Sequence, residues 1–303
     1  MKLRIRKRIF PRRLGDILCF LLIVVFLPLV AFFDVVVVVP AIHTPGEFMH
    51  SFIFTIAMFL IFNINGNMFA TMMVDTSLDA INLIVPEDAS ENGWHSCERC
   101  KKLTPPRSYH CKVCKKCILK RDHHCVFTGC CVGHYNIRYF ALFLVYMFVG
   151  SLLSFFYLSY YLFWVRAETF RHILSLFKML GPILMVAHGG KWDNLPLLYY
   201  NLNIVALVIS SILLVYHGIP IIRGGTSYER RFNYPYGRDF YSNLRTIFGK
   251  RMYLVWISPF IGSELLDDGA NSEEVLDNAP LQRPSSQKLR NRVNHHSRKS
   301  RLD

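Results

Sequence analysis

Four long apolar stretches constrain the fold of this chain more than any other feature. They run roughly over Ile17–Val39, His50–Val74, Tyr139–Val165 and Leu195–Ile222. Each can cross a bilayer, which takes about 20 helical residues. Only 18% of the 303 residues are charged, fewer than the ~25% of a typical soluble domain. The chain is therefore expected to be a mainly α, polytopic membrane protein with four transmembrane helices.

The net charge of +14 could indicate binding to nucleic acid, but the distribution of the charge indicates a membrane protein. Basic residues are concentrated in 1–16, in 75–138 and from 223 onward, whereas Pro40–Met49 holds none. Such alternation is typical of membrane proteins, whose cytosolic loops carry the excess of Lys and Arg. Both termini and the segment 75–138 are thus predicted to be cytosolic, with the lipid bilayer as a partner and no nucleic acid.

One further apolar segment, Ile173–Ala187, is short, contains Lys178 and is interrupted by Gly181-Pro182. We expect an interfacial or re-entrant element there, because a fifth span would move the C-terminus to the opposite side. No internal repeat is expected. The predicted organisation is a basic N-terminus (1–16), two spans (17–74), a cytosolic cysteine-rich domain (75–138), two spans with a luminal loop (139–222), a cytosolic C-terminal region (223–266) and a disordered tail (267–303).

The cytosolic segment is rich in potential metal ligands. Eight of the nine cysteines lie between Cys97 and Cys131, together with His110, His123 and His124. In a reducing compartment these thiols serve metal binding or catalysis and do not form disulfides. Paired C-x-x-C cysteines followed by further His and Cys are typical of zinc sites. Two tetrahedral sites need eight of these eleven residues, and the surplus suggests chemistry.

Asp122, His123 and Cys125 could supply that chemistry. A cysteine nucleophile needs a base, and the base needs an orienting carboxylate. Spacing alone does not show that the three side chains converge, and on spacing alone a purely structural zinc module is the favoured interpretation.

The segment resembles the DHHC domain of protein S-acyltransferases, also called palmitoyltransferases. The matching positions are Cys97, Cys100, Pro105, Arg107, His110, Cys111, Cys114, Cys117, Asp122, His123, His124, Cys125, Cys131, Val132, Gly133 and Asn136. After the last span, Thr226-Ser-Tyr-Glu229 resembles the family's Thr-Thr-x-Glu motif. Tyr236-Gly237, Asn243 and Phe248-Gly249 resemble its aromatic-Gly and Asn element, and Tyr253–Phe260 looks most like the short-tailed animal branch.

This resemblance implies short β-hairpins that bind two structural Zn²⁺ ions. One site would be Cys97, Cys100, His110 and Cys117, and the other Cys111, Cys114, His124 and Cys131. It also implies a protein-cysteine S-palmitoyltransferase in which Cys125 is the nucleophile, His123 the base and Asp122 the carboxylate that orients the base. The expected acyl donor is palmitoyl-CoA, and the expected substrates are membrane-associated proteins with cytosolic cysteines, at the endoplasmic reticulum or Golgi.

Further residues are assigned by the same resemblance. Arg107 and Arg138 are expected to bind the CoA phosphates, although ordinary cytosolic positive charge explains them equally well. The supporting residues around the site would be Thr226, Ser227, Glu229 and Asn243, with the Ser227 hydroxyl on Asp122.

The loop after Cys125 departs from the family. The usual Pro-Trp-Val-Asn-Asn is replaced by Val126–Cys130, in which Phe127 keeps an aromatic ring and Cys130 adds a thiol for which no role is expected. This departure keeps an alternative open, a catalytically weak zinc-binding membrane scaffold. A membrane-bound zinc ubiquitin ligase fits the ligand spacing poorly.

Overall fold

The computed structural model describes residues 5–87, 89, 93–167, 195–232 and 239–270. Within them, four helical segments are long and apolar enough to cross a membrane. They are α1 (Leu14–Phe33) continued by η1 (Asp34–Val38) and α2 (Val39–Ile42), α3 (Phe48–Met73), α4 (Ile137–Tyr160) continued by η3 (Tyr161–Val165), and α7 (Leu195–Ile222). The four expected spans are thus confirmed. The segment Ile173–Ala187 and Tyr236-Gly237 lie outside the described residues.

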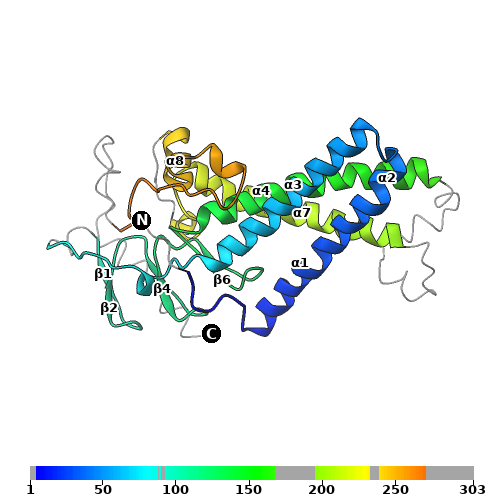
Figure 1. Ribbon diagram of the computed structural model, residues 1–303. Coiled ribbons are helices and arrows are strands. Elements are labelled where there is room, and N and C mark those ends of the chain that lie inside the picture. Colours follow the sequence, from blue (N-terminus) through cyan, green and yellow to red (C-terminus); the bar gives the residue numbers. More distant parts are fainter. Residues whose placement is uncertain (1–4, 88, 90–92, 168–194, 233–238, 271–303) are drawn as a thin grey trace. The chain divides into compact units, whose positions relative to one another are not determined.

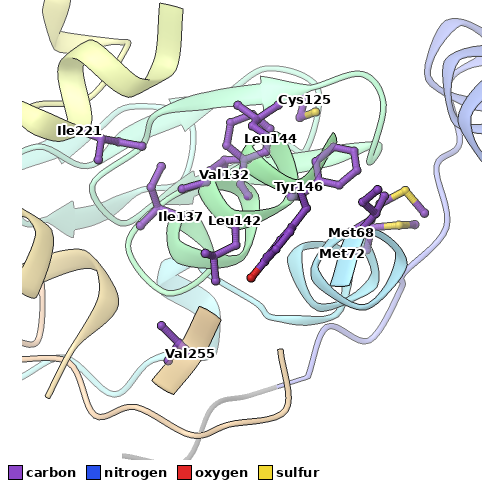
Figure 2. Close-up of a cluster of buried hydrophobic side chains, with 14 of the residues drawn as sticks. Met68, Met72, Cys125, Val132, Ile137, Leu142, Leu144, Tyr146, Ile221 and Val255 are labelled. Carbon is purple, nitrogen blue, oxygen red and sulfur yellow. The ribbon is translucent and has the colours of Figure 1, made fainter. Parts of the chain in front are cut away.

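Helix α4 packs against both α3 and α7 (Figure 1). The largest buried cluster joins Met68 and Met72 of α3 to Leu142 and Tyr146 of α4 and to Ile221 of α7 (Figure 2). By contrast, much of the apolar surface of α1 is exposed in the described chain. An apolar surface of this kind suits contact with lipid tails.

Two buried asparagines of α3 hydrogen-bond mainly within their own helix. The amide of Asn63 donates to the carbonyls of Phe59 at 3.1 Å and Ile257 at 3.3 Å, and that of Asn67 donates to Asn63 at 2.9 Å. The second bond of Asn63 joins α3 to another part of the chain, because Ile257 follows η7 (Leu254–Trp256) directly.

Between α3 and α4 the chain forms three two-stranded antiparallel hairpins, at the end of the helices seen in Figure 1. Their strands are β1 (His95–Cys97) with β2 (Lys102–Thr104), β3 (Tyr109–Cys111) with β4 (Lys116–Ile118), and β5 (His123–Cys125) with β6 (Cys130–Val132). The predicted cysteine-rich module of short hairpins is confirmed.

Asn136 ties the last hairpin to two spans. Its amide donates to the carbonyls of Thr71 and Cys131, both at 3.0 Å, and its Oδ1 accepts the Gly133 N–H at 2.8 Å. A Cβ at Gly133 would lie 2.6 Å from the Leu119 carbonyl oxygen, so only glycine fits there. The module is thereby held against the C-terminal end of α3 and the N-terminal end of α4.

After α7 the described chain contains η6 (Glu229–Phe232), α8 (Phe240–Phe248) and η7. A disordered tail is expected from residue 267, yet the first residues of that segment pack on the module. Asp267 pairs with Lys120 at 2.9 Å, and the Tyr135 hydroxyl donates to the Asp268 carbonyl at 3.0 Å. Residues 271–303 lie outside the described chain.

Candidate active site and metal-binding module

The eight predicted metal ligands form two separate sets. They are Cys97, Cys100, His110 and Cys117, and Cys111, Cys114, His124 and Cys131; the donor atoms of each set lie within 4.8 Å of one another. In each set a histidine Nδ1 approaches a thiol, at 3.2 Å between His110 and Cys100 and at 3.3 Å between His124 and Cys114. Three thiols with one imidazole suit tetrahedral Zn²⁺, so the residues fit the implied metal.

Each set takes its ligands from two successive hairpins. One hairpin supplies two cysteines, one at the end of its first strand and one in its turn. The next hairpin supplies a histidine and a cysteine from facing positions. His110 lies opposite Cys117, and His124 lies opposite Cys131. Metal bound in this way would join the hairpins to one another, because none of them is large enough to form its own core.

The three hairpins follow a repeat of 14 residues, which corrects the expectation that the chain has none. Cys97, Cys111 and Cys125 each end the first strand of a hairpin at this interval. The amide of Lys101 donates to the Cys97 carbonyl, and that of Lys115 to the Cys111 carbonyl, both at 2.8 Å. The first two turns therefore have the same geometry.

The third turn keeps this conformation but lacks the second ligand. The last residue of each turn has positive φ, at 52° for Lys101, 55° for Lys115 and 60° for Gly129. In the third turn Thr128 stands where the first two have their second cysteine. Cys125 thus occupies the position of a metal ligand but belongs to neither ligand set.

Strand β5 separates metal binding from the remaining polar residues by simple alternation. Successive side chains of a strand point to opposite faces. His123 and Cys125 therefore share one face, while His124, between them, faces the second ligand set.

His123 is hydrogen-bonded to a buried carboxylate. Its Nδ1 lies 2.6 Å from Oδ2 of Asp122, which is 2% exposed. Oδ1 of Asp122 accepts the backbone N–H of Ser227 at 2.6 Å. Burial opposes ionisation of Asp122, but the hydrogen bonds from histidine and from this amide outweigh it and lower the pKa of the carboxyl. The carboxylate can therefore orient the imidazole through Nδ1–H.

Cys125 is buried at the edge of the main apolar cluster (Figure 2). Burial raises the pKa of its thiol to about 11, in spite of a hydrogen bond with Thr128. Burial also lowers the pKa of His123, so its imidazole is neutral and able to accept a proton. A neutral thiol on the same strand face as a neutral imidazole suits proton removal during the reaction.

His217 is a part of the site that the sequence analysis missed. From α7, its Nδ1 lies 3.2 Å from Oδ2 of Asp122 and 2.8 Å from Oγ of Ser227. The hydroxyl of Ser227 therefore contacts His217, whereas its backbone amide makes the expected contact with Asp122. The only signal in the sequence was a single histidine within an otherwise uncharged span.

The Thr226–Glu229 motif folds as a capping box and binds the module. The Thr226 N–H donates to the Glu229 carboxylate at 2.9 Å, and the Glu229 N–H donates to Oγ1 of Thr226 at 3.3 Å. The same carboxylate accepts two hydrogen bonds from Arg107, at 2.6 and 2.8 Å. Thr226 and Glu229 thus support the site by joining the end of α7 to the hairpins.

The other predicted supporting residues also make internal contacts. Arg138 is buried and donates to the Ser263 carbonyl at 3.0 Å and to the Tyr139 hydroxyl. Asn243 of α8 donates to the carbonyl of Ile222, the last residue of α7, at 2.8 Å. For Arg107 and Arg138, a contact with CoA phosphates stays a prediction, and their internal partners argue against it.

A second residue that sequence reasoning missed is Asp16. Its carboxylate lies 3.2 Å from Nε2 of His124, whose Nδ1 faces the second ligand set. Carboxylates commonly orient metal-binding histidines in this way. The start of α1 is thereby linked to the metal-binding module.

A cavity of about 260 Å³ lies among the helices. Side chains from all four spans line it, among them Leu22, Ile53, Phe143 and Leu202, and Phe127 of the loop after Cys125 also contributes. The lining is mostly apolar. The cavity can therefore accept a hydrocarbon chain from the direction of the third hairpin.

Four apolar helices, two Cys₃His ligand sets and a buried cysteine beside an Asp-His pair define a class of membrane enzyme with a zinc-finger-like module. The chain belongs to the DHHC palmitoyltransferase family, whose model matches residues 90–233. It is 36% identical to a Danio rerio protein described as probable palmitoyltransferase ZDHHC24, over 70% of this chain and 72% of the relative. The Homo sapiens protein of that description is 32% identical, over 73% and 78%. The chain is accordingly a protein S-palmitoyltransferase.

Proposed function

We propose that the protein transfers a long-chain acyl group from acyl-CoA to the Cys125 thiol and then from Cys125 to a cysteine of a membrane-associated protein. The His123 imidazole takes the proton of the thiol, and the sulfur attacks the thioester carbonyl. The carbon–sulfur bond of acyl-CoA breaks, CoA leaves as a thiol with the proton from His123, and an acyl-Cys125 thioester forms. The substrate thiol then gives its proton to His123 and attacks this thioester, and Cys125 is released and takes that proton.

The observation that carries this proposal is the face shared by His123 and Cys125, with Asp122 bonded to His123 at 2.6 Å. Such a pair can generate a thiolate inside a buried site, where a free thiolate would be costly. The cavity lined by Phe127 supports a long hydrocarbon chain as the transferred group.

Two Zn²⁺ ions in the two ligand sets would be structural. Each set has four protein donors, which leaves no open position of the kind that catalytic zinc keeps for water or substrate. When bound, the metal would hold the third hairpin rigid. We further propose cytosolic termini and a cytosolic module, in line with the charge distribution, and residence in the endoplasmic reticulum or Golgi, which the resemblance to the family implies.

A clickable palmitoyl-CoA analogue tests the proposal on the purified full chain. The protein is expected to become labelled through a hydroxylamine-sensitive bond, and Cys125→Ser to abolish the label while keeping about two zinc ions per chain. Cys130→Ala is the matched control, because Cys130 faces Cys125 in the same hairpin, and it should retain the label. Labelling that persists in Cys125→Ser would contradict the assignment of the nucleophile.

The alternative is a zinc-binding membrane scaffold with weak or absent activity. It predicts no label in the parent protein above that of Cys125→Ser, although both would hold zinc. The replaced loop Val126–Cys130 is the feature that favours it.

A further inference from the structure

His217 is buried in the fourth span and takes part in three contacts with the candidate site. Its side chain bonds Asp122 and Ser227, and its ring lies against that of His123, with ring centroids 4.3 Å apart and planes at 31°. Phe140 of α4 meets both imidazoles edge-on, at 4.8 Å from His123 and 5.1 Å from His217.

The hydrogen bonds decide which atoms carry protons. A carboxylate can only accept, so Nδ1 of His217 must donate to Asp122, and this N–H is shared with Oγ of Ser227. Oδ2 of Asp122 then accepts from two imidazoles, and Oδ1 accepts from the Ser227 amide. Three donors from two segments leave the carboxylate one orientation.

The ring contacts restrict His123 in the same way. Because the rings of His217 and Phe140 both contact it, the imidazole of His123 has little freedom to rotate about its side-chain bonds. A base that is held in one orientation loses less entropy on reaching the transition state.

We propose that His217 is a positioning residue of the transferase reaction. It acts through Asp122 and the ring of His123 and touches neither acyl-CoA nor the protein substrate. This proposal rests on the roles of Cys125 and His123 proposed above. A competing explanation exists, because Asp122, His123 and His217 place one donor atom each within 4.8 Å of one another and could hold a metal ion.

Three substitutions separate these explanations. His217→Asn can place an amide nitrogen near the position of Nδ1, His217→Gln places it near Nε2 instead, and His217→Phe keeps a ring without a donor. Each purified full-length variant is mixed with palmitoyl-CoA, and the single-turnover rate constant of Cys125 acylation, the half-saturating palmitoyl-CoA concentration and the zinc content are measured. His50→Phe is the control, since His50 stacks on Phe54 at the start of α3, the end opposite to that on which the module packs, and neither residue lines the cavity.

We expect His217→Phe and His217→Gln to be slower by roughly tenfold, the equivalent of one net hydrogen bond. His217→Asn should recover to within about threefold of the parent, since it restores the donor. The half-saturating concentration and the zinc content should not change, and His50→Phe should behave as the parent.

Equal rates in all four variants would overturn the proposal, as would equal losses in His217→Asn and His217→Gln, which would indicate packing alone. If the parent held three metal ions per chain and the His217 variants held two, the cluster would be a metal site instead. Labelling of Cys125→Ser would contradict the proposed function. Parent-like rates in the His217 variants would contradict only the role of His217, so the two failures can be told apart.

Discussion

Two neighbouring histidines on one short strand are expected to respond differently to the same substitution. His124→Ala should release zinc, because His124 belongs to a ligand set and metal binding contributes folding free energy. His123→Ala should keep zinc but acylate slowly, since loss of a general base typically costs about 10²–10⁴-fold. Zinc analysis and single-turnover labelling measure both effects.

Cys111→Ala serves as the control for metal loss and should match His124→Ala. Equal loss of zinc in all three variants would contradict the separation of roles along β5.

Ser227 illustrates how a backbone contact changes a prediction. The Asp122 carboxylate accepts the amide of Ser227, and Ser227→Ala keeps that amide. Removal of the hydroxyl leaves the His217 N–H bonded to Asp122 alone. We therefore expect Ser227→Ala to slow autoacylation by no more than about threefold, less than the full value of a hydrogen bond. A tenfold loss in single-turnover labelling would indicate that the hydroxyl itself holds Asp122.

At the scale of elements, the ion pair between Arg107 and Glu229 joins the hairpins to the end of α7. Both side chains are largely buried, at 14% and 2% exposure. Glu229→Gln should remove the negative charge from this buried pair, and breaking a buried pair typically costs about 3–5 kcal/mol. The expected result is a clear fall in the thermal unfolding midpoint in detergent.

Glu264→Gln provides the matched control, because Glu264 pairs with Lys250 at a site where both side chains are 57% exposed. Exposed pairs contribute little, so no measurable shift is expected there. Equal shifts in the two variants would show that the Arg107–Glu229 pair does not hold the elements together.

The contact between α1 and the second ligand set gives another prediction. Asp16→Ala should leave His124 without the carboxylate on its Nε2, and loss of such a partner typically weakens metal binding by about 10–100-fold. Release of zinc to a chelator should therefore be faster. Asp79→Ala, which removes an exposed partner of Lys102, is the control and should release zinc as the parent does.

At the scale of the whole chain, the charge pattern predicts a single side for both termini and the module. Tags placed after Met1, near Asn92 and near Arg301 should all be accessible to protease in sealed vesicles. A protected tag near Arg301 would mean that Ile173–Ala187 crosses the membrane.

The spans and the presence of zinc-type ligands could be predicted from the sequence because both depend on local patterns, namely hydropathy over a window and short Cys/His spacing. The division of those ligands into two sets came from the resemblance to the family. His217, Asp16 and the Arg107 pairing could not be predicted. They depend on contacts between residues that are 95, 108 and 122 positions apart in the sequence. Single polar residues within or beside apolar spans form no periodic pattern that would indicate such contacts. The contact of Ser227 with Asp122 was expected through the hydroxyl, whereas the structure makes it through the backbone amide. A sequence motif does not distinguish these two donors.

The 14-residue repeat has a consequence for how a nucleophile arises beside metal sites. Since each ligand set borrows from two adjacent hairpins, three hairpins can complete only two sets, and the final turn has no successor to borrow from. A further repeat would call on positions 138 and 145, which are Arg138 and Val145 at the start of α4. The unshared thiol at the end of the series is Cys125. The availability of this thiol for reaction would follow from ending a structural series one unit early.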